Sequence, residues 1–342
     1  MNVCDVIDFL KTEDISIAPT EELSAFLKRH NCYYLLSKLK NNGYDTLVNS
    51  IALKTRYNEC KSIFEQINFP YAIIKGAALS STLYKNPYIR QSGDIDILIS
   101  RNNVDELEKI LLSNGFIQGR ITEMGIKPFS REEKIYYSVN THQIAPFMKS
   151  TNSKIIPCVS FDVNLDILWG EHSKETDMSY VLEHLATFEL FGHNLYKLSP
   201  EMEFVSLCMH HYKDMNSIYL LVKGSLCLGL FCDINDYICN VSMNLCELQE
   251  ICEKLEVGKY VYECIKLTYQ IFNNNETYKY LTCFKKYEDK FLDNTFGLND
   301  KERKTWTIPL LERIFHSNLS EYIFQMLSED EINKIDINYK MM

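Results

Sequence analysis

The sequence predicts an α+β protein in which a small mixed sheet is flanked by N-terminal helices and a C-terminal helical domain. Apolar residues at helical spacing dominate the first 67 residues. Between residues 71 and 169, short β-branched runs alternate with helix-forming stretches, which is typical of a mixed sheet. Helical patterns return after Trp169. We therefore expect domains over residues 1–67, 68–170 and 171–342.

The elements of the first two domains are predicted from periodicity and from the residues that begin and end each element. Two amphipathic helices come first, and a strand–helix–strand–helix succession and two more strands follow. The last of these helices has Asn102 or Asn103 as a cap and Gly115 as its C-terminal stop. In chain order, we expect helices over 21–39 and 45–67, a strand over 71–75, a helix over 76–84, a strand over 94–100, a helix over 102–116, and strands over 134–140 and 155–169.

The C-terminal domain is predicted from helical patterns. The first of them begins with Ser199 as a cap and Pro200 in the first turn. We expect a short strand or hairpin arm over 190–199 and surface loops over 273–280 and 297–304. The helical patterns cover residues 199–215, 217–240, 245–256 and 259–272.

Composition excludes several classes of protein. An apolar fraction of 46% describes a globular chain, and the net charge of -10 argues against general nucleic-acid binding, which needs a basic face. The N-terminal segment carries acids within its short apolar stretch, so we expect no signal peptide. The best apolar run, near residues 217–234, is interrupted by Lys223, so we expect no membrane association and a cytoplasmic location.

Cysteine usage also favours a cytoplasmic location. The 12 cysteines are scattered and contain no CxxC pair, which favours reduced and mostly buried thiols over a disulfide scaffold. Because no paired cysteine spacing exists to begin a site, zinc is not expected either.

Two aspartates at the start of the strand over 94–100 suggest chemistry. Residues two apart in a strand point to the same side, so Asp94 and Asp96 present both carboxylates to one face. Two neighbouring carboxylates repel each other, and a divalent cation relieves the repulsion. A third acid on another strand would complete a site for two Mg²⁺ ions, and either Asp162 or Asp166 is placed to supply it.

The segment before these acids has features of a phosphate site. Gly76 follows a strand and opens a helix, so the backbone N–H groups there can face phosphate oxygens. Lys75 and Arg90 add positive charge, and Ser92 offers a further hydrogen bond. Each motif is common when it occurs alone. It is the order of strand, Lys-Gly, helix, Arg-x-Ser-Gly-Asp-x-Asp and strand that makes the pattern specific.

These residues resemble the DNA polymerase β-type nucleotidyltransferase superfamily, and within it a bacterial group of uncharacterised nucleotidyltransferases. The resemblance covers mainly residues 71–100, with weaker similarity to about residue 235. The shared pattern falls on Lys75, Gly76, Ala77, Ala78, Tyr84, Arg90, Gly93, Asp94 and Asp96.

The resemblance implies a small mixed sheet, a nucleoside triphosphate with magnesium, and transfer of a nucleoside monophosphate. It implies that Asp94, Asp96 and a third acid, Asp162, hold metal and carry catalysis. The nucleotide would be bound by Lys75, Gly76, Ala77, Arg90, Ser92 and Gly93.

Two departures and one further similarity concern the substrate. Members of the group often carry acid-x-His-Trp at the third position, where this chain has Asn164 in place of the histidine. Ala77 replaces a common glycine or serine, so only a backbone contact to phosphate remains. His210 and His211, followed by Asp233, resemble the histidine-bearing helix of the group, and we take Asn164 and His211 as candidate substrate residues.

The expected reaction is attack of an acceptor hydroxyl on the α-phosphate of an NTP, taken here as ATP, with pyrophosphate leaving. The acidic chain favours a small molecule or a peptide as acceptor. A toxin-like enzyme acting on tRNA or protein is the next possibility. A non-catalytic nucleotide-binding module and a plain helical scaffold with the two aspartates in a surface turn also stay open.

Overall fold

The computed structural model of the chain describes residues 21–32, 43–88, 92–170 and 172–341. It contains two compact units, one over residues 43–203 and one that combines residues before 43 with residues after 203. We call them the sheet unit and the helical unit. The helix over 43–66 thus belongs with the sheet. The domains expected at 1–67, 68–170 and 171–342 stay a prediction.

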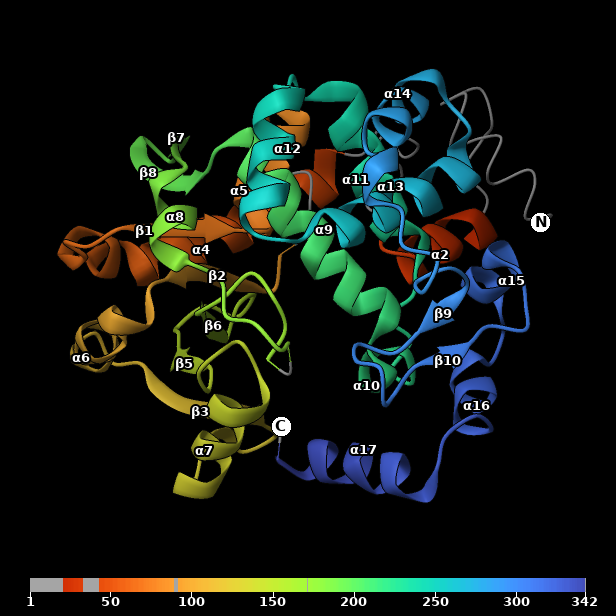
Figure 1. Ribbon diagram of the computed structural model, residues 1–342. Helices are drawn as coiled ribbons and strands as arrows, with labels where there is room; N and C mark the ends of the chain where they lie inside the picture. Colours follow the sequence, from red (N-terminus) through yellow and green to blue (C-terminus); the bar gives the residue numbers. More distant parts are fainter. Residues whose placement is uncertain (1–20, 33–42, 89–91, 171, 342) are drawn as a thin grey trace. The chain divides into compact units, whose positions relative to one another are not determined.

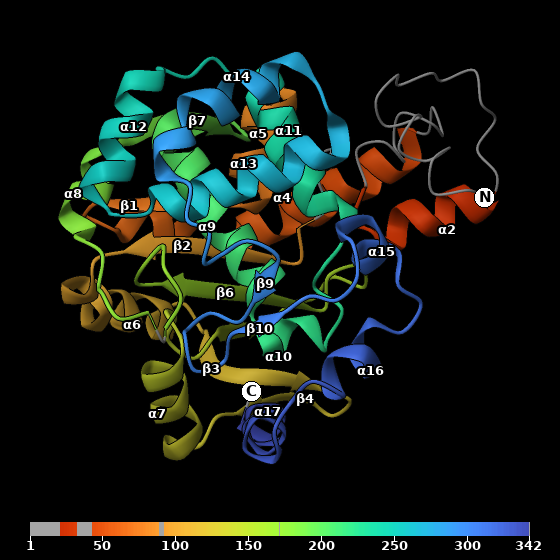
Figure 2. The ribbon, with the colours of Figure 1, turned by 45° about the vertical axis from the view of Figure 1, so that its right-hand side comes forward.

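The sheet unit contains a six-stranded mixed sheet, which confirms the α+β expectation. The strand order is β1-β2-β6-β5-β3-β4. In Figure 2 the labels β1, β2, β6, β3 and β4 follow this order from top to bottom. Strands β2 and β6 are parallel, whereas every other neighbouring pair is antiparallel. The strands are β1 (Tyr71–Ile74), β2 (Asp94–Ile99), β3 (Ile117–Thr122), β4 (Gly125–Pro128), β5 (Phe147–Ser150) and β6 (Cys158–Asn164).

Several helices lie between these strands in the chain, and the hairpin of β7 and β8 follows them (Figure 1). The expected hairpin arm over 190–199 is confirmed as part of β7 and β8. The elements are α4 (Gly43–Gln66), α5 (Gly76–Tyr84), η1 (Arg101–Asn103), α6 (Val104–Ser113), α7 (Arg131–Asn140), α8 (Met178–Glu183), β7 (Leu185–Leu190) and β8 (His193–Leu198).

One face of the sheet forms the core of the unit. The alternating residues Ile95, Ile97 and Ile99 of β2 pack in one buried cluster with apolar residues of β6, α4 and α6. Because side chains alternate between faces along a strand, Asp94 and Asp96 are directed to the opposite face. Burial of the isoleucine face fixes the register, and the register places the acids.

The strand predicted over 134–140 is wrong, because these residues lie in α7. The Ser130 side chain accepts a hydrogen bond from the Glu133 backbone N–H, and the Glu133 carboxylate accepts one from the Ser130 N–H. This capping box stabilises a helix start that outweighs the strand preference of the β-branched and aromatic residues after it. Arg120 of β3 also pairs with Glu133, at 2.5 Å.

The helical unit confirms most of the predicted helices, with two corrections. The pattern over 217–240 is divided into α10 and α11, since Gly224 adopts a φ of 78° between them. The loop predicted over 273–280 is largely helix α14, whose cap Asn274 accepts a hydrogen bond from the Thr277 N–H. Residues 33–39 of the first predicted helix lie outside the described residues.

Figure 1 labels the elements of this part of the chain except η2. They are α2 (Glu21–Arg29), α9 (Pro200–Asn216), α10 (Ile218–Leu221), α11 (Leu228–Asn240), α12 (Leu245–Lys254), α13 (Gly258–Phe272), α14 (Asn275–Cys283), η2 (Lys285–Tyr287), β9 (Thr295–Phe296), β10 (Lys304–Thr305), α15 (Leu310–Phe315), α16 (Leu319–Phe324) and α17 (Glu329–Met341). The first turn of α9 precedes the unit boundary.

Two further expectations concern the whole described chain. The eleven cysteines from Cys32 to Cys283 that the structure describes are free thiols. Among the described helices, none combines the length and the apolar character needed to cross a bilayer.

Candidate active site

Three carboxylates meet on the two parallel strands at the centre of the sheet. The register pairs Asp96 of β2 with Asp162 of β6, and Asp94 with Ser160. Since Asp94 and Asp96 share a face, the carboxylates of Asp94, Asp96 and Asp162 lie together on the side away from the isoleucine core. The geometry therefore brings together the three acids that the sequence singled out.

The electrostatics of this cluster show that the acids repel one another. Burial, followed by the charges of Asp96 and Asp94, raises the pKa of Asp162 to about 7. Burial and the charge of Asp96 also raise the pKa of Asp94. The Ser160 hydroxyl donates a hydrogen bond to Asp162 Oδ1 at 2.7 Å, which opposes part of the shift. Such a cluster is stabilised by added positive charge.

Asp96 is the most buried of the three acids, with 7% of its surface exposed, and it has two compensating partners. Lys75 Nζ lies 3.0 Å from Asp96 Oδ1. The Asn164 amide donates to the same oxygen at 3.2 Å and accepts a hydrogen bond from Gln143 Nε2 at 2.8 Å. Asn164, a candidate substrate residue, therefore holds Asp96 in place, and its contact with a substrate stays a prediction.

The turn between β1 and α5 has an unusual backbone. Lys75 has a φ of 58° and Gly76 a φ of 38°, both in the left-handed region. A Cβ added to Gly76 would lie 2.7 Å from Ser92 Oγ, so only glycine lets the two segments approach. The Ser92 hydroxyl donates to the Asp94 carbonyl oxygen at 2.8 Å, which holds the Ser92 side chain at the start of β2.

The remaining predicted nucleotide-binding residues differ in their surroundings. Ala77 is buried in the first turn of α5. Gly93 is exposed, and a Cβ there would meet nothing within 4 Å. Arg90 lies outside the described residues.

Asp162 and Asp166 are distinguished by where β6 ends. The strand stops at Asn164, so Asp166 does not continue the polar face of the sheet. Its carboxylate instead accepts hydrogen bonds from the backbone N–H groups of Leu168 and Thr176, at 2.8 and 2.9 Å. Asp166 thus stabilises the chain after the strand, and Asp162 is the acid beside Asp96.

Sequence reasoning missed Arg56 of α4. Its charge acts on Asp94, and its buried Nε has no hydrogen-bond partner among the described residues. Arg56 lines a cavity of about 150 Å³ together with Asn49, Pro87, Ser92 and Ile156. In an amphipathic helix pattern an arginine indicates a solvated face, so only the packing of α4 identifies this one.

His211 belongs to the helical unit. Its side chain is 1% exposed, and its Nε2 lies 3.1 Å from Asp233 Oδ2 of α11. Its role toward a substrate stays a prediction.

Comparison with known proteins gives a family match over most of the chain. A family model described as "Uncharacterised nucleotidyltransferase" matches residues 23–273. Among curated proteins, nothing matches. A solved structure, of an antigenic nucleotidyltransferase-like protein from Paracoccidioides brasiliensis, is similar at 15% identity and a TM-score of 0.33, covering 63% of this chain and 91% of that chain.

Proposed function

Because the chain belongs to the uncharacterised nucleotidyltransferase family, we propose that it moves a nucleoside monophosphate from an NTP to an acceptor hydroxyl, with magnesium. The observation that carries this proposal is the parallel register of β2 and β6, which sets Asp162 beside Asp96 and next to Asp94. Three carboxylates on neighbouring strands, together with the glycine turn before α5, suit a metal-bound triphosphate.

The donor set fits magnesium. All three side chains offer only carboxylate oxygens, which are the ligands that this hard cation prefers. Each of these acids lies in the field of another, and the pKa of Asp162 is raised to about 7. Two magnesium ions, when bound, would activate the acceptor hydroxyl and neutralise the leaving pyrophosphate.

Other residues of the chain would bind the triphosphate. Gly76 and the backbone N–H groups that open α5 would bind the triphosphate. Lys75 now neutralises Asp96, and its flexible stem lets the ammonium turn to a phosphate oxygen instead. Arg56 and Arg90 would add positive charge around the same phosphates.

The reaction would form one bond and break one. The acceptor oxygen attacks the α-phosphorus, and the bond from that phosphorus to the bridging oxygen breaks, so that pyrophosphate leaves. A carboxylate oxygen of Asp162 would orient the acceptor hydroxyl or accept its proton. ATP is the first donor to test, and the net charge of -10 favours a small molecule or a peptide over RNA as acceptor.

Calorimetric titration of the four NTPs, with and without Mg²⁺, tests the site. We expect one NTP to bind in a magnesium-dependent way, and Asp94→Asn/Asp96→Asn to abolish or sharply weaken that binding. The matched control is Asp105→Asn/Glu106→Gln, which removes two exposed carboxylates from the first turn of α6. No NTP binding to folded wild type, or binding that survives the Asp94/Asp96 change, would contradict the proposal.

Acceptor identity is tested with the NTP that binds, labelled at its α-phosphate. Candidate small hydroxyl compounds, peptides and tRNA are incubated with the protein, and transfer of label is followed. We expect labelled product from the first two classes, and label on tRNA alone would overturn the acceptor assignment.

A further inference from the structure

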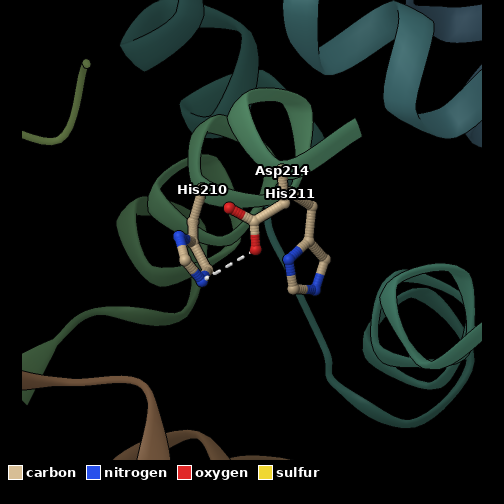
Figure 3. Close-up of side chains that lie close together, drawn as sticks. All are labelled: His210, His211 and Asp214. Carbon is tan, nitrogen blue, oxygen red and sulfur yellow. Dashed lines mark ion pairs between the residues drawn. The ribbon is translucent and has the colours of Figure 1, made fainter. Parts of the chain in front are cut away.

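A second group of possible metal ligands lies in the helical unit, on α9. Figure 3 shows the side chains of His210, His211 and Asp214, whose ligand atoms all lie within 4.8 Å of one another. His210 Nε2 is 3.5 Å from Asp214 Oδ2. We propose that these three residues bind a divalent transition metal of the Zn²⁺ type, at a site separate from the three carboxylates.

The side chain that points to a ligand is His211. It is 1% exposed, and its Nδ1 is a buried nitrogen with no hydrogen-bond partner in the described part of the chain. In Figure 3 the nitrogen of His211 nearer to Asp214 faces the other two side chains. A buried polar atom without a partner costs roughly 1–3 kcal/mol, so a ligand at this position would remove a real penalty.

The other nitrogen of His211 determines which form of the ring is present. Nε2 lies 3.1 Å from the Asp233 carboxylate, which has no proton to donate when ionised. In the neutral ring, Nε2 therefore carries the hydrogen and Nδ1 keeps its lone pair. A carboxylate that orients a histidine so that the second nitrogen faces outward is the usual support of a metal-binding imidazole. Asp233 is thus a positioning residue.

The spacing of the ligand atoms suits a small tetrahedral ion. Zn–N and Zn–O distances near 2.0–2.1 Å place tetrahedral ligands roughly 3.3 Å apart. The distance of 3.5 Å between His210 Nε2 and Asp214 Oδ2 already agrees with this value. Asp214 Oδ1 lies 4.0 Å from Lys213 Nζ, so the two oxygens of Asp214 have different neighbours.

The ligand types decide the class of metal. Two imidazole nitrogens and one carboxylate suit zinc, nickel, copper or iron, whereas magnesium prefers oxygen. Three protein ligands also leave a fourth position for water or an anionic group. Sequence reasoning expected no zinc because it looked for paired cysteines, and this group contains none.

The experiment uses the full chain, stripped of metal with a chelator, with Zn²⁺ alone and Co²⁺ alone as probes. Exposed thiols bind these ions too, so the background carries Cys239→Ser, Cys246→Ser and Cys283→Ser. We expect one Zn²⁺ per chain by elemental analysis after dialysis. Co²⁺ should give visible d–d absorption without a thiolate charge-transfer band.

Variants assign the ligands. His210→Gln and Asp214→Asn change half-buried side chains and should each lower Zn²⁺ affinity at least tenfold. Asp233→Asn should lower it by roughly 10–100-fold, as expected for a group that orients a ligand. The matched control, His316→Gln on the same unit, and the double variant Asp94→Asn/Asp96→Asn should keep wild-type Zn²⁺ affinity.

Three results would overturn the inference. The first is a chain that retains less than one Zn²⁺ after dialysis. The second is stoichiometric Zn²⁺ that survives both His210→Gln and Asp214→Asn. The third is a cobalt spectrum with thiolate charge transfer, which would place the ion on cysteine. Because these readouts require no NTP, they are independent of the proposed transferase activity.

Discussion

The two units gather charged side chains in different ways. In the sheet unit, Asp96 and Asp162 are far apart in sequence and meet only because β2 and β6 pair in parallel. In the helical unit, His210, His211 and Asp214 lie within one turn or so of α9, and only Asp233 comes from another helix. The first arrangement depends on sheet register, whereas the second depends mainly on helical periodicity.

The difference in ligand chemistry follows the difference in construction. The sheet unit offers three carboxylates that repel one another, and the helical unit offers two imidazoles and one carboxylate. An oxygen-only site favours magnesium with phosphates, and a nitrogen-rich site favours a transition metal. The two proposed sites would therefore take different classes of metal.

Removal of one carboxylate from the sheet unit should have the largest effect and tests whether the two sites are independent. We expect Asp96→Asn to lower nucleotidyl transfer by on the order of a thousandfold or more, because several kcal/mol of charge stabilisation depend on the bound metal. Steady-state transfer with α-labelled NTP measures it. Zn²⁺ affinity should stay at the wild-type value, and a parallel loss of Zn²⁺ would show that the two sites are not separate.

The turn before α5 gives the next largest effect. In Gly76→Ala the new Cβ would lie 2.7 Å from Ser92 Oγ at a φ of 38°, so the turn must shift. We expect NTP affinity to fall by about 10- to 100-fold and the free energy of unfolding by roughly 1–3 kcal/mol. Calorimetry and urea unfolding measure the two quantities.

Gly125→Ala is the matched control for this change, because Gly125 also has a positive φ, 107°, while a Cβ there meets nothing within 4 Å. Equal losses of NTP affinity in both variants would mean that close approach at Gly76 is not what the nucleotide requires.

A smaller effect within the sheet unit is expected for Arg56, which lies near Asp94. We expect Arg56→Gln to weaken NTP or acceptor binding by about tenfold, since one charge beside the phosphates is lost. Arg101→Gln, at a side chain that is 61% exposed, is the control. The KM values for NTP and acceptor, measured separately, show which substrate Arg56 contacts, and unchanged values for both would remove it from the site.

The smallest effect concerns stability of the helical unit. Burial, with a contribution from Arg29, lowers the pKa of His30 from 6.5 to about 4. The unfolded chain therefore binds the extra proton first, and stability present above pH 6.5 is lost as the pH falls towards 4. We expect His30 to cost about 1–2 kcal/mol at pH 5, after allowance for partial solvation.

Urea unfolding at pH 7 and pH 5 measures this loss. His30→Gln should reduce the difference between the two pH values, whereas His316→Gln should leave it unchanged. An identical pH dependence in His30→Gln and wild type would assign the loss to other groups.

Much of the fold could be predicted from sequence because its signals are local. The alternation in β2, the stop of α6 and the periodicity of α4 each lie within one element. Asp94 and Asp96 could be singled out as candidates for the same reason. The cap of α6 is confirmed only in position, since Asn103 precedes the helix without a side-chain hydrogen bond to it. Helix α7 was missed because a capping box of two residues, Ser130 and Glu133, outweighs ten residues of ambiguous pattern.

What sequence could not give was contact between distant segments. Nothing in the order of residues shows that Asp162 lies beside Asp96, or that Asp166 turns away to cap the following chain. Arg56 could be identified only from the packing of α4. The orientation of His211, with Nδ1 free of hydrogen-bond partners among the described residues, follows from its contact with Asp233. These contacts join segments that are distant in sequence, and both candidate sites depend on them.

The parallel pairing of β2 and β6 also has a consequence for how such a protein can diversify. The chain leaves the sheet centre after Ile99 and returns at Cys158, and the excursion forms β3, β4, α7 and β5 on one side of β6. All three acids lie on β2 and β6. The outer hairpin of β3 and β4 can therefore be lengthened, trimmed or replaced with the three acids left in register.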